Sequence, residues 1–195
     1  MTENRIATKI DHLGEGAVFF PSDFDDLGSA DTVRQALSRL VRKGRIIRLC
    51  NGVYCTPRKN KLLGLSNITP STDEIARRIA ERDHVKIIPT GDTALNLTGL
   101  STQIPMNAVY LTNGSRKDLT LFDGRRIIFK ESNESRRFRF TSQMVMLVVS
   151  AMRAIGQTII TSDQVEILKG LLAGVTKEEF DKNIRLAPAW VKSKL

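Results

Sequence analysis

The stretch that decides the fold of the first half of this chain is SADTVRQALSRLVRKG, at residues 29–44. At about 100° per residue, its apolar side chains fall in one arc of a helix, and the opposite arc carries only polar side chains. Ser29 is a suitable N-cap and Gly44 a suitable C-terminal stop. We therefore expect an amphipathic helix over residues 30–43. It should bury Val33, Ala36, Leu37, Leu40 and Val41 and expose Asp31, Thr32, Arg34, Gln35, Ser38, Arg39 and Arg42.

The segment before this helix predicts two short helices and a strand. Ile6, Ile10 and Leu13 have helical spacing, and Gly14 follows them as a stop. Residues 17–20 are typical of a short strand ended by Pro21, and Ser22 is a plausible N-cap for a short helix through Asp26. We expect the first helix, Phe19 and Phe24 to pack on the apolar arc of the helix over 30–43.

The segment after the helix predicts a hairpin, and with it a winged helix-turn-helix. Residues 46–49 and 53–56 flank Asn51-Gly52, a strong hairpin signal. The order of helix, strand, helix, turn, helix and hairpin is that of a winged helix-turn-helix domain. Asn51 and Gly52 would then form the tip of the wing.

The two cysteines flank the same turn. A two-residue turn places Cys50 opposite Val53 and Cys55 opposite Arg48, so that the two thiols are diagonal neighbours roughly 7–8 Å apart. That separation suits a disulfide poorly, and we expect two reduced thiols. With only two histidines besides, His12 and His84, there is no zinc pattern. We expect no metal and no cofactor.

The positive charge of the chain is concentrated. The net charge is +9, with 30 Lys and Arg against 21 Asp and Glu. The span from Arg34 to Lys61 holds nine basic residues and no acidic one, whereas Met1–Val33 holds two basic and seven acidic residues. A basic span inside a foldable pattern indicates contact with nucleic acid.

The exposed arc of the helix has side chains suited to a major groove. Arg binds guanine, Gln binds adenine, and Ser and Thr contact bases or phosphates. Because the first half of such a helix usually contacts the bases, we expect base contacts from Thr32, Arg34, Gln35, Ser38 and Arg39. Arg42, Lys43, Arg45 and Arg48 are better placed for phosphates, and Ser29 and Asn51 complete the predicted DNA-binding set. Asp31 argues mildly against this interpretation, because it suits a helix N-terminus but repels a phosphate.

The second half predicts an α+β domain. Residues 57–61 break the pattern, 62–70 are expected to be a polar linker, and 71–195 to form the second domain. The capping box Ser71-Thr72-Asp73-Glu74 opens a helix to about Arg82. A strand at 85–88 and a short helix at 92–97 follow. Three strands at 108–112, 118–122 and 125–130, with turns at Asn113-Gly114 and Asp123-Gly124, indicate an antiparallel meander. Helices are expected over 141–155, 161–172 and 176–183, the last two opened by the capping boxes Thr161-x-x-Gln164 and Thr176-x-x-Glu179.

The second half also holds a basic and aromatic cluster, Arg136-Arg137-Phe138-Arg139-Phe140. Alternating basic and aromatic side chains can bind single-stranded nucleic acid. A strand edge leading into a helix accounts for the pattern as well, and we favour that interpretation.

No strong catalytic motif is present, and we expect no enzyme and no catalytic residues. A phosphate loop, a nucleophile elbow and paired metal-binding histidines are all missing. Gly28-Ser29 and Asp23-x-Asp25 superficially resemble a nucleotidyltransferase motif. There the carboxylates should follow the Gly-Ser pair and lie on a strand to hold magnesium, whereas here they precede it in an expected helix.

The protein is expected to be cytoplasmic. The longest apolar run, residues 144–149, is far shorter than the roughly 20 residues of a membrane span. The first five residues, MTENR, do not begin an apolar signal region.

Several of these motifs, in this order, resemble the antitoxins of the AbiEi type, which belong to bacterial type IV toxin–antitoxin systems. In the first half they are Gly14–Phe24, Gln35–Gly44 and Asn51–Tyr54, which resemble the N-terminal winged helix of that family. In the second half they are Pro89–Gly91, Asn96–Pro105 and Leu186–Trp190, which resemble its shorter members.

The resemblance implies a DNA-binding autorepressor that is also an antitoxin. The winged helix would repress the antitoxin–toxin operon at inverted repeats in its own promoter. The second domain would counteract a nucleotidyltransferase-type toxin, without a stable complex between the two proteins. Two other hypotheses remain: a protein-interaction module whose basic face meets an acidic partner without binding DNA, and a nucleic-acid-modifying enzyme that uses Asp23 and Asp25.

Overall fold

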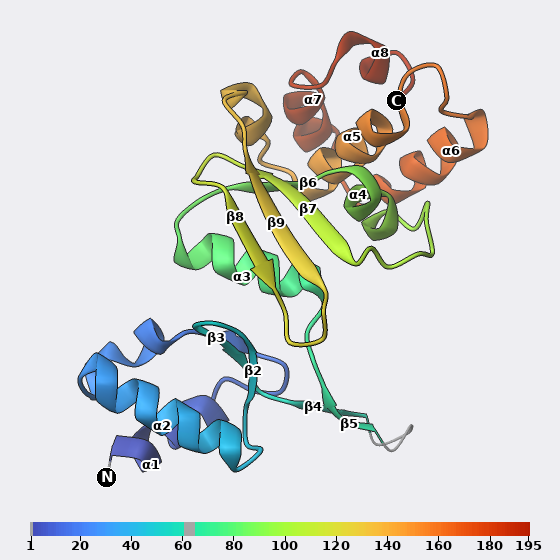
Figure 1. Cartoon of the computed structure of the whole chain (residues 1–195). Helices are drawn as coiled ribbons and strands as arrows, with labels where there is room; N and C mark the ends of the chain where they lie inside the picture. Colours follow the sequence, from blue (N-terminus) through green and yellow to red (C-terminus); the bar gives the residue numbers. More distant parts are fainter. Residues whose placement is uncertain (1, 61–64) are drawn as a thin grey trace. The chain divides into compact units, whose positions relative to one another are not determined.

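The computed structural model describes residues 2–60 and 65–195, and it has the α+β architecture expected from the sequence (Figure 1). The chain divides into two compact units. Unit 1 comprises Met1–Ile79 and Thr120–Gly124, and unit 2 comprises Ala80–Leu119 and Arg125–Leu195. Among the described residues, no helix is both long enough and apolar enough to cross a membrane.

Unit 1 begins with the element order of a winged helix-turn-helix, as predicted. The elements are α1 (Thr2–Asp11), β1 (Val18–Phe19), the 3-10 helix η1 (Pro21–Leu27), α2 (Ala30–Arg42), β2 (Ile47–Cys50) and β3 (Val53–Cys55). The three strands form an antiparallel sheet in the order β1-β3-β2. The hairpin β2–β3 is therefore the wing.

Helix α2 is positioned by its caps and its apolar face. The side chain of Ser29 accepts a hydrogen bond from Thr32 N, and Gly44 follows the helix with a φ of +66°, a conformation that favours glycine. As predicted, Val33, Ala36, Leu37 and Leu40 are buried and Val41 is partly buried; they form one core with Ile6, Ile10, Phe19 and Phe24. Phe19 packs edge-on against Phe24 and is stacked on Tyr54. This core holds α2 with its polar face outward.

Two local expectations in unit 1 were wrong. Ser22 does not cap the second helix; the N-cap is Phe20, whose backbone N–H donates to Asp23 Oδ2 at 2.9 Å, and Pro21 is the first residue of η1.

In the wing, Cys50 faces Val53 as expected, but Cys55 faces Ile47 instead of Arg48 because the register shifts between Arg48 and Cys50. Both cysteines are free thiols, and burial raises the pKa of the Cys55 thiol to about 12.

The expected linker contains a strand. β4 (Arg58–Asn60) pairs antiparallel with β5 (Leu65–Ile68), so residues 65–68 are not irregular chain. Lys61 and the first part of the linker, residues 62–64, lie outside the described residues. α3 (Thr72–Arg82) then begins at the predicted capping box, in which Ser71 Oγ accepts from Glu74 N and Ser71 N donates to Glu74 Oε2. Ile75, Ala76, Ile79 and Ala80 of α3 are all buried.

The sheet of unit 2 is mixed; the predicted meander was wrong in the pairing of its first two strands, and right that the second and third are neighbours. Its strands are β6 (Ile87–Pro89), β7 (Asn107–Thr112), β8 (Lys117–Thr120) and β9 (Arg126–Glu131), in the order β6-β7-β9-β8. β7 pairs parallel with β9, and Asn113 pairs back toward β6 through two bonds with the backbone of Lys86. Ile127 and Phe129 of β9 are buried, whereas no β8 residue is, so the more apolar strand takes the interior position. The strand expected at 85–88 is β6 at 87–89; Pro89 is its last residue, and a missing N–H is tolerated there because β6 is an edge strand.

The helices of unit 2 are α4 (Gly91–Leu97), the 3-10 helix η2 (Ser135–Arg139), α5 (Gln143–Ile155), α6 (Ser162–Leu171), α7 (Lys177–Ile184) and α8 (Ala189–Lys192). Helix α5 packs against β6, and α4, α6 and α7 pack against α5 (Figure 1). Thr161 caps α6 in a capping box with Gln164, as predicted, and the Thr176 side chain caps α7 by accepting a hydrogen bond from Glu179 N. Val148, Ala151 and Met152 of α5 form the centre of the core.

Candidate nucleic-acid interface

The polar arc of α2 forms one exposed face. Each of its predicted members is exposed: Asp31, Thr32, Arg34, Gln35, Ser38, Arg39 and Arg42. Arg34, Gln35, Ser38, Arg39 and Arg42 line a single shallow hollow on the surface. We call the polar arc together with the basic residues after it, Lys43, Arg45 and Arg48, the α2 face.

The N-terminal end of the α2 face is held by local hydrogen bonds. Ser29 Oγ accepts from Thr32 N at 3.4 Å and lies 2.9 Å from Thr32 Oγ1, so the two hydroxyls already bond each other. Arg34 Nε donates to Ala30 O at 3.3 Å, and its guanidinium lies 3.5 Å from the Asp31 carboxylate. Arg34 is thus folded back on its own helix, and its side chain would have to swing outward to reach a base.

The C-terminal end of the α2 face is paired with carboxylates from α1. Lys43 Nζ lies 2.6 Å from Glu3 Oε1, and Arg39 lies 3.4 Å from the other Glu3 oxygen. Arg45 makes a bidentate pair with Asp11 at 2.8 and 2.9 Å. The hydrogen bond from Lys43 is the main cause that lowers the pKa of Glu3. The basic span without a carboxylate is therefore partly neutralised by two carboxylates of α1, Glu3 and Asp11.

This pairing is what the sequence analysis missed. The signal was present in the opposite charges of Met1–Val33 and the span that follows, but the partners are 34 to 40 residues apart. Spacing along one helix predicts pairs three or four residues apart only. Contacts between two packed helices had to come from the structure.

Two arginines of the α2 face have no carboxylate partner within the described part of the chain. Arg42 is exposed at the end of α2 and makes no ion pair there. Arg48, on the wing strand β2, donates from Nη2 to the side-chain oxygen of Asn51 at 2.8 Å. Arg48 and Asn51 are thus held together beside the turn, where Gly52 has a φ of +71°. Arg42 and Arg48 are the members of the face most available to a phosphate.

Further along, Arg58 pairs with Glu74 of α3 at 2.6 Å. The hydrogen bond from Arg58 is the main cause that lowers the pKa of Glu74. This pair links the segment after the wing to α3.

Asp23, one of the two carboxylates of the enzyme hypothesis, serves local structure. Asp23 Oδ2 accepts from Phe20 N, and it also lies 3.4 Å from the Arg78 guanidinium. Asp23 and Asp25 both lie on η1 and not on a strand. Among the described residues, no group of three or more His, Cys, Asp or Glu side chains is arranged to hold a metal ion.

The basic and aromatic cluster at residues 136–140 is the 3-10 helix η2 and the residue after it, which lead into α5. Phe138 is buried, and Phe140 packs against the core of unit 2. The aromatic rings are therefore not laid out as a stacking platform for bases. The favoured interpretation was right that the segment leads into a helix and wrong that it is a strand edge.

Taken together, unit 1 presents a winged helix-turn-helix whose exposed helix carries amide, hydroxyl and guanidinium groups on a face that is basic overall. The chain belongs to a family described as "Family of unknown function (DUF6088)", whose model matches residues 5–180 and so includes residues of both units. No curated protein matches the chain.

Proposed function

We propose that this protein is a DNA-binding autorepressor and antitoxin of a bacterial type IV toxin–antitoxin operon, active in the cytoplasm. The observation that carries the DNA-binding part is the α2 face: an exposed helix face of Arg, Gln and Ser side chains, placed by a buried apolar core in a winged-helix frame. The antitoxin part rests on the resemblance of the ordered motifs to AbiEi-type antitoxins. The proposal includes no catalytic step, metal or cofactor.

On the α2 face, different residues would carry specificity and affinity. Gln35 and Ser38 are exposed in the middle of the helix and would contact base edges, together with Arg34 once it leaves Asp31. Arg42 and Arg48 would contact phosphates directly. Arg39, Lys43 and Arg45 would exchange Glu3 and Asp11 for phosphates, and exposed ion pairs of this kind cost little to break.

The test is binding of the protein to the DNA upstream of its own reading frame, followed by fluorescence anisotropy. Gln35→Ala should reduce discrimination at one base position by about 1–3 kcal/mol, because a bidentate contact to adenine is lost. Arg48→Ala should weaken all sequences alike and reduce the salt slope by about one. Lys177→Ala, which removes an exposed cation from α7, is the matched control and should change neither. Equal binding by wild type and all three variants would contradict the proposal.

The antitoxin part needs a separate test. The nucleotidyltransferase-type protein encoded beside this chain should arrest growth when it is expressed alone, and co-expression of this chain should restore growth. A type IV mechanism also predicts that the two proteins do not co-purify. Growth arrest without rescue would remove the antitoxin part and leave DNA binding untouched.

One observation favours a second function, docking of an acidic protein on the α2 face. Glu3 and Asp11 show that Arg39, Lys43 and Arg45 accept carboxylates in this geometry. A stable complex with an acidic protein, together with no DNA shift at low salt, would favour this alternative.

A further inference from the structure

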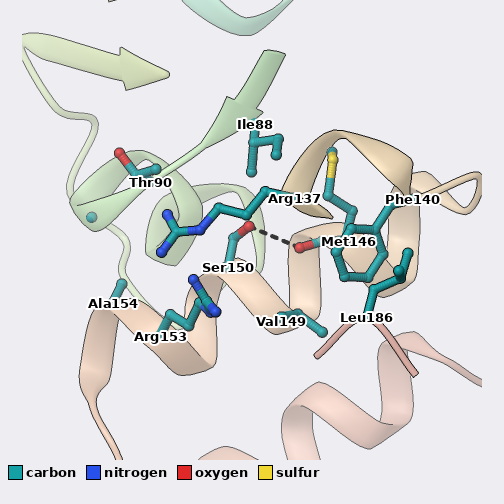
Figure 2. A pocket seen from close by; sticks show the side chains of 11 residues that line it. Ile88, Thr90, Arg137, Phe140, Met146, Val149, Ser150, Arg153, Ala154 and Leu186 are labelled. Atoms are coloured by element: carbon teal, nitrogen blue, oxygen red, sulfur yellow. Dashed lines mark hydrogen bonds between the residues drawn. The ribbon is translucent and has the colours of Figure 1, made fainter. Parts of the chain in front are cut away.

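Unit 2 contains a pocket of about 210 Å³ that the proposed function does not use (Figure 2). It lies between β6, the segment after it, η2 and α5. Its lining combines an apolar wall, with Phe140, Met146 and Leu186, and two arginines, Arg137 and Arg153. Ligand sites in proteins usually combine an apolar lining with a few charged or polar groups in this way.

The two arginines reach the pocket from different elements. Arg137 comes from η2 and Arg153 from the last turn of α5, and Figure 2 shows both guanidinium groups directed into the same space. Their side chains are 29% and 33% exposed, so both are largely withdrawn from water while still open to a ligand. Two like charges held together in this way require an anion for full compensation.

The protein supplies only part of that compensation. Glu134 Oε2 lies 2.6 Å from Arg137 Nε and 3.9 Å from Arg153 Nη1, and this carboxylate is 60% exposed at the rim. Arg137 Nε is buried, and although this carboxylate lies beside it, the two groups are not aligned for a hydrogen bond in the described part of the chain. Burial, and next the charge of Arg137, lower the pKa of Arg153, so the environment disfavours its positive charge.

A third arginine adds to the positive charge near the pocket. Arg136 donates to the backbone oxygen of Arg185 at 2.6 Å, and its charge also acts to lower the pKa of Arg153. Arg136 is thus a further positive charge near Arg137 and Arg153, which share one carboxylate. A dianion compensates this positive charge better than a monoanion does.

The hydroxyls at the pocket are already engaged. Ser150 Oγ donates to Met146 O at 2.8 Å, and Thr90 Oγ1 donates to Val109 O at 3.3 Å. The free donors are thus those of the guanidinium groups, whose planar forks match the oxygens of a phosphate. The adjacent wall of Phe140, Met146 and Val149 offers no polar partner and suits an apolar body.

We propose that this pocket binds a small phosphate monoester with an apolar body, the phosphate between Arg137 and Arg153 and the body against Phe140 and Met146. The volume admits a body of about one ring. This inference goes beyond the DNA-binding and antitoxin proposal and does not depend on it, because every group that it uses lies in unit 2.

The experiment is isothermal titration calorimetry of the full chain at pH 8, where a phosphate monoester is a dianion. The probes are phenyl phosphate, inorganic phosphate, phenylacetate and phenol. Phenyl phosphate should bind saturably at one site per chain. Inorganic phosphate lacks the apolar body and should bind about tenfold more weakly or worse. Phenylacetate carries one charge and should also bind more weakly, and phenol should not bind in the same concentration range.

Variants connect the binding to the two arginines. Arg153→Gln and Arg137→Gln should each weaken phenyl phosphate binding by about tenfold or more, because each removes a charged hydrogen-bond donor. Arg139→Gln removes a neighbouring exposed arginine of η2 that does not line the pocket, and it should leave binding unchanged. If circular dichroism shows that Arg137→Gln is unfolded, Arg153→Gln alone decides the test.

Three outcomes would overturn the proposal. The first is no heat of binding for phenyl phosphate with the folded wild type. The second is an equal loss of affinity in Arg139→Gln and Arg153→Gln. The third is binding of phenol or inorganic phosphate as tight as that of phenyl phosphate, which would deny the pairing of a charged head with an apolar body. None of them bears on DNA binding by unit 1.

Discussion

The α2 face of unit 1 and the pocket of unit 2 both concentrate arginines, but they compensate the charge differently. On the α2 face, Arg39, Lys43 and Arg45 are exposed and have carboxylates from α1 beside them. In the pocket, Arg137 and Arg153 are about two-thirds covered and share one carboxylate at the rim. An exposed cation is already stabilised by water, so it can exchange partners at little cost. A covered cation without full compensation favours a specific small anion.

The largest difference that we expect between the two regions is their response to salt. Raising the salt concentration from 50 to 200 mM should weaken binding of promoter DNA by roughly 10³-fold or more, because a face with several phosphate contacts displaces as many counterions. Binding of phenyl phosphate to the pocket should fall far less, since one ligand meets a partly covered site. Anisotropy with labelled DNA measures the salt dependence of DNA binding, and calorimetry measures that of phenyl phosphate binding. A flat salt response for DNA would contradict the assignment of the α2 face.

Most of α2 could be predicted because the residues that determine its ends and its buried face lie within the helix or next to it. The Ser29 cap, the Gly44 stop and the apolar arc lie within one helix and its two ends, and all three appear in the structure. The same holds for the Ser71 and Thr161 caps, which depend on a side chain three residues away.

The failures in the sheet of unit 2 and in the ion pairs depend on partners far apart in the chain, whereas the Ser22 cap and the register of the wing were local failures. The turn signal at Asn113-Gly114 predicted that β7 and β8 would pair, but β9 competes for the same edge of β7 with more apolar residues, Ile127 and Phe129. The pairing of Glu3 with Lys43, and the meeting of Arg137 and Arg153 in one pocket, likewise come from tertiary packing. Residue spacing alone could not predict any of these contacts.

Substitutions on the two faces of α2 should differ in their effect on stability. Leu37 is fully buried and Gln35 is exposed. Leu37→Ala should lower the free energy of unfolding by about 2–5 kcal/mol, because it removes core contacts and leaves a cavity. Gln35→Ala should change it by about 0.5 kcal/mol or less while it still reduces DNA discrimination. Urea denaturation of the two variants checks this. Similar destabilisation by both would mean that α2 does not present its polar arc to solvent.

The smallest expected effect concerns the competitor on the α2 face, Glu3. If its carboxylate occupies Arg39 and Lys43 in the free protein, Glu3→Gln should raise DNA affinity about two- to fivefold. Asn4→Ala, which removes a neighbouring polar side chain of the same helix without a change in charge, is the control and should leave DNA affinity unchanged. The ion pair also makes the effect depend on pH. Because Lys43 and Arg39 lower the pKa of Glu3, the carboxylate stays charged down to a pH below its ordinary range. Its contribution to the folded state is therefore present above the ordinary pKa of a glutamate and is lost as the pH falls through the lowered one.

Wild type and Glu3→Gln should bind DNA differently at pH 7 and converge only at a pH below that lowered value, as measured by anisotropy at constant ionic strength. A difference that persists after Glu3 is protonated would show that the substitution acts through the packing of α1 and not through competition for the cations.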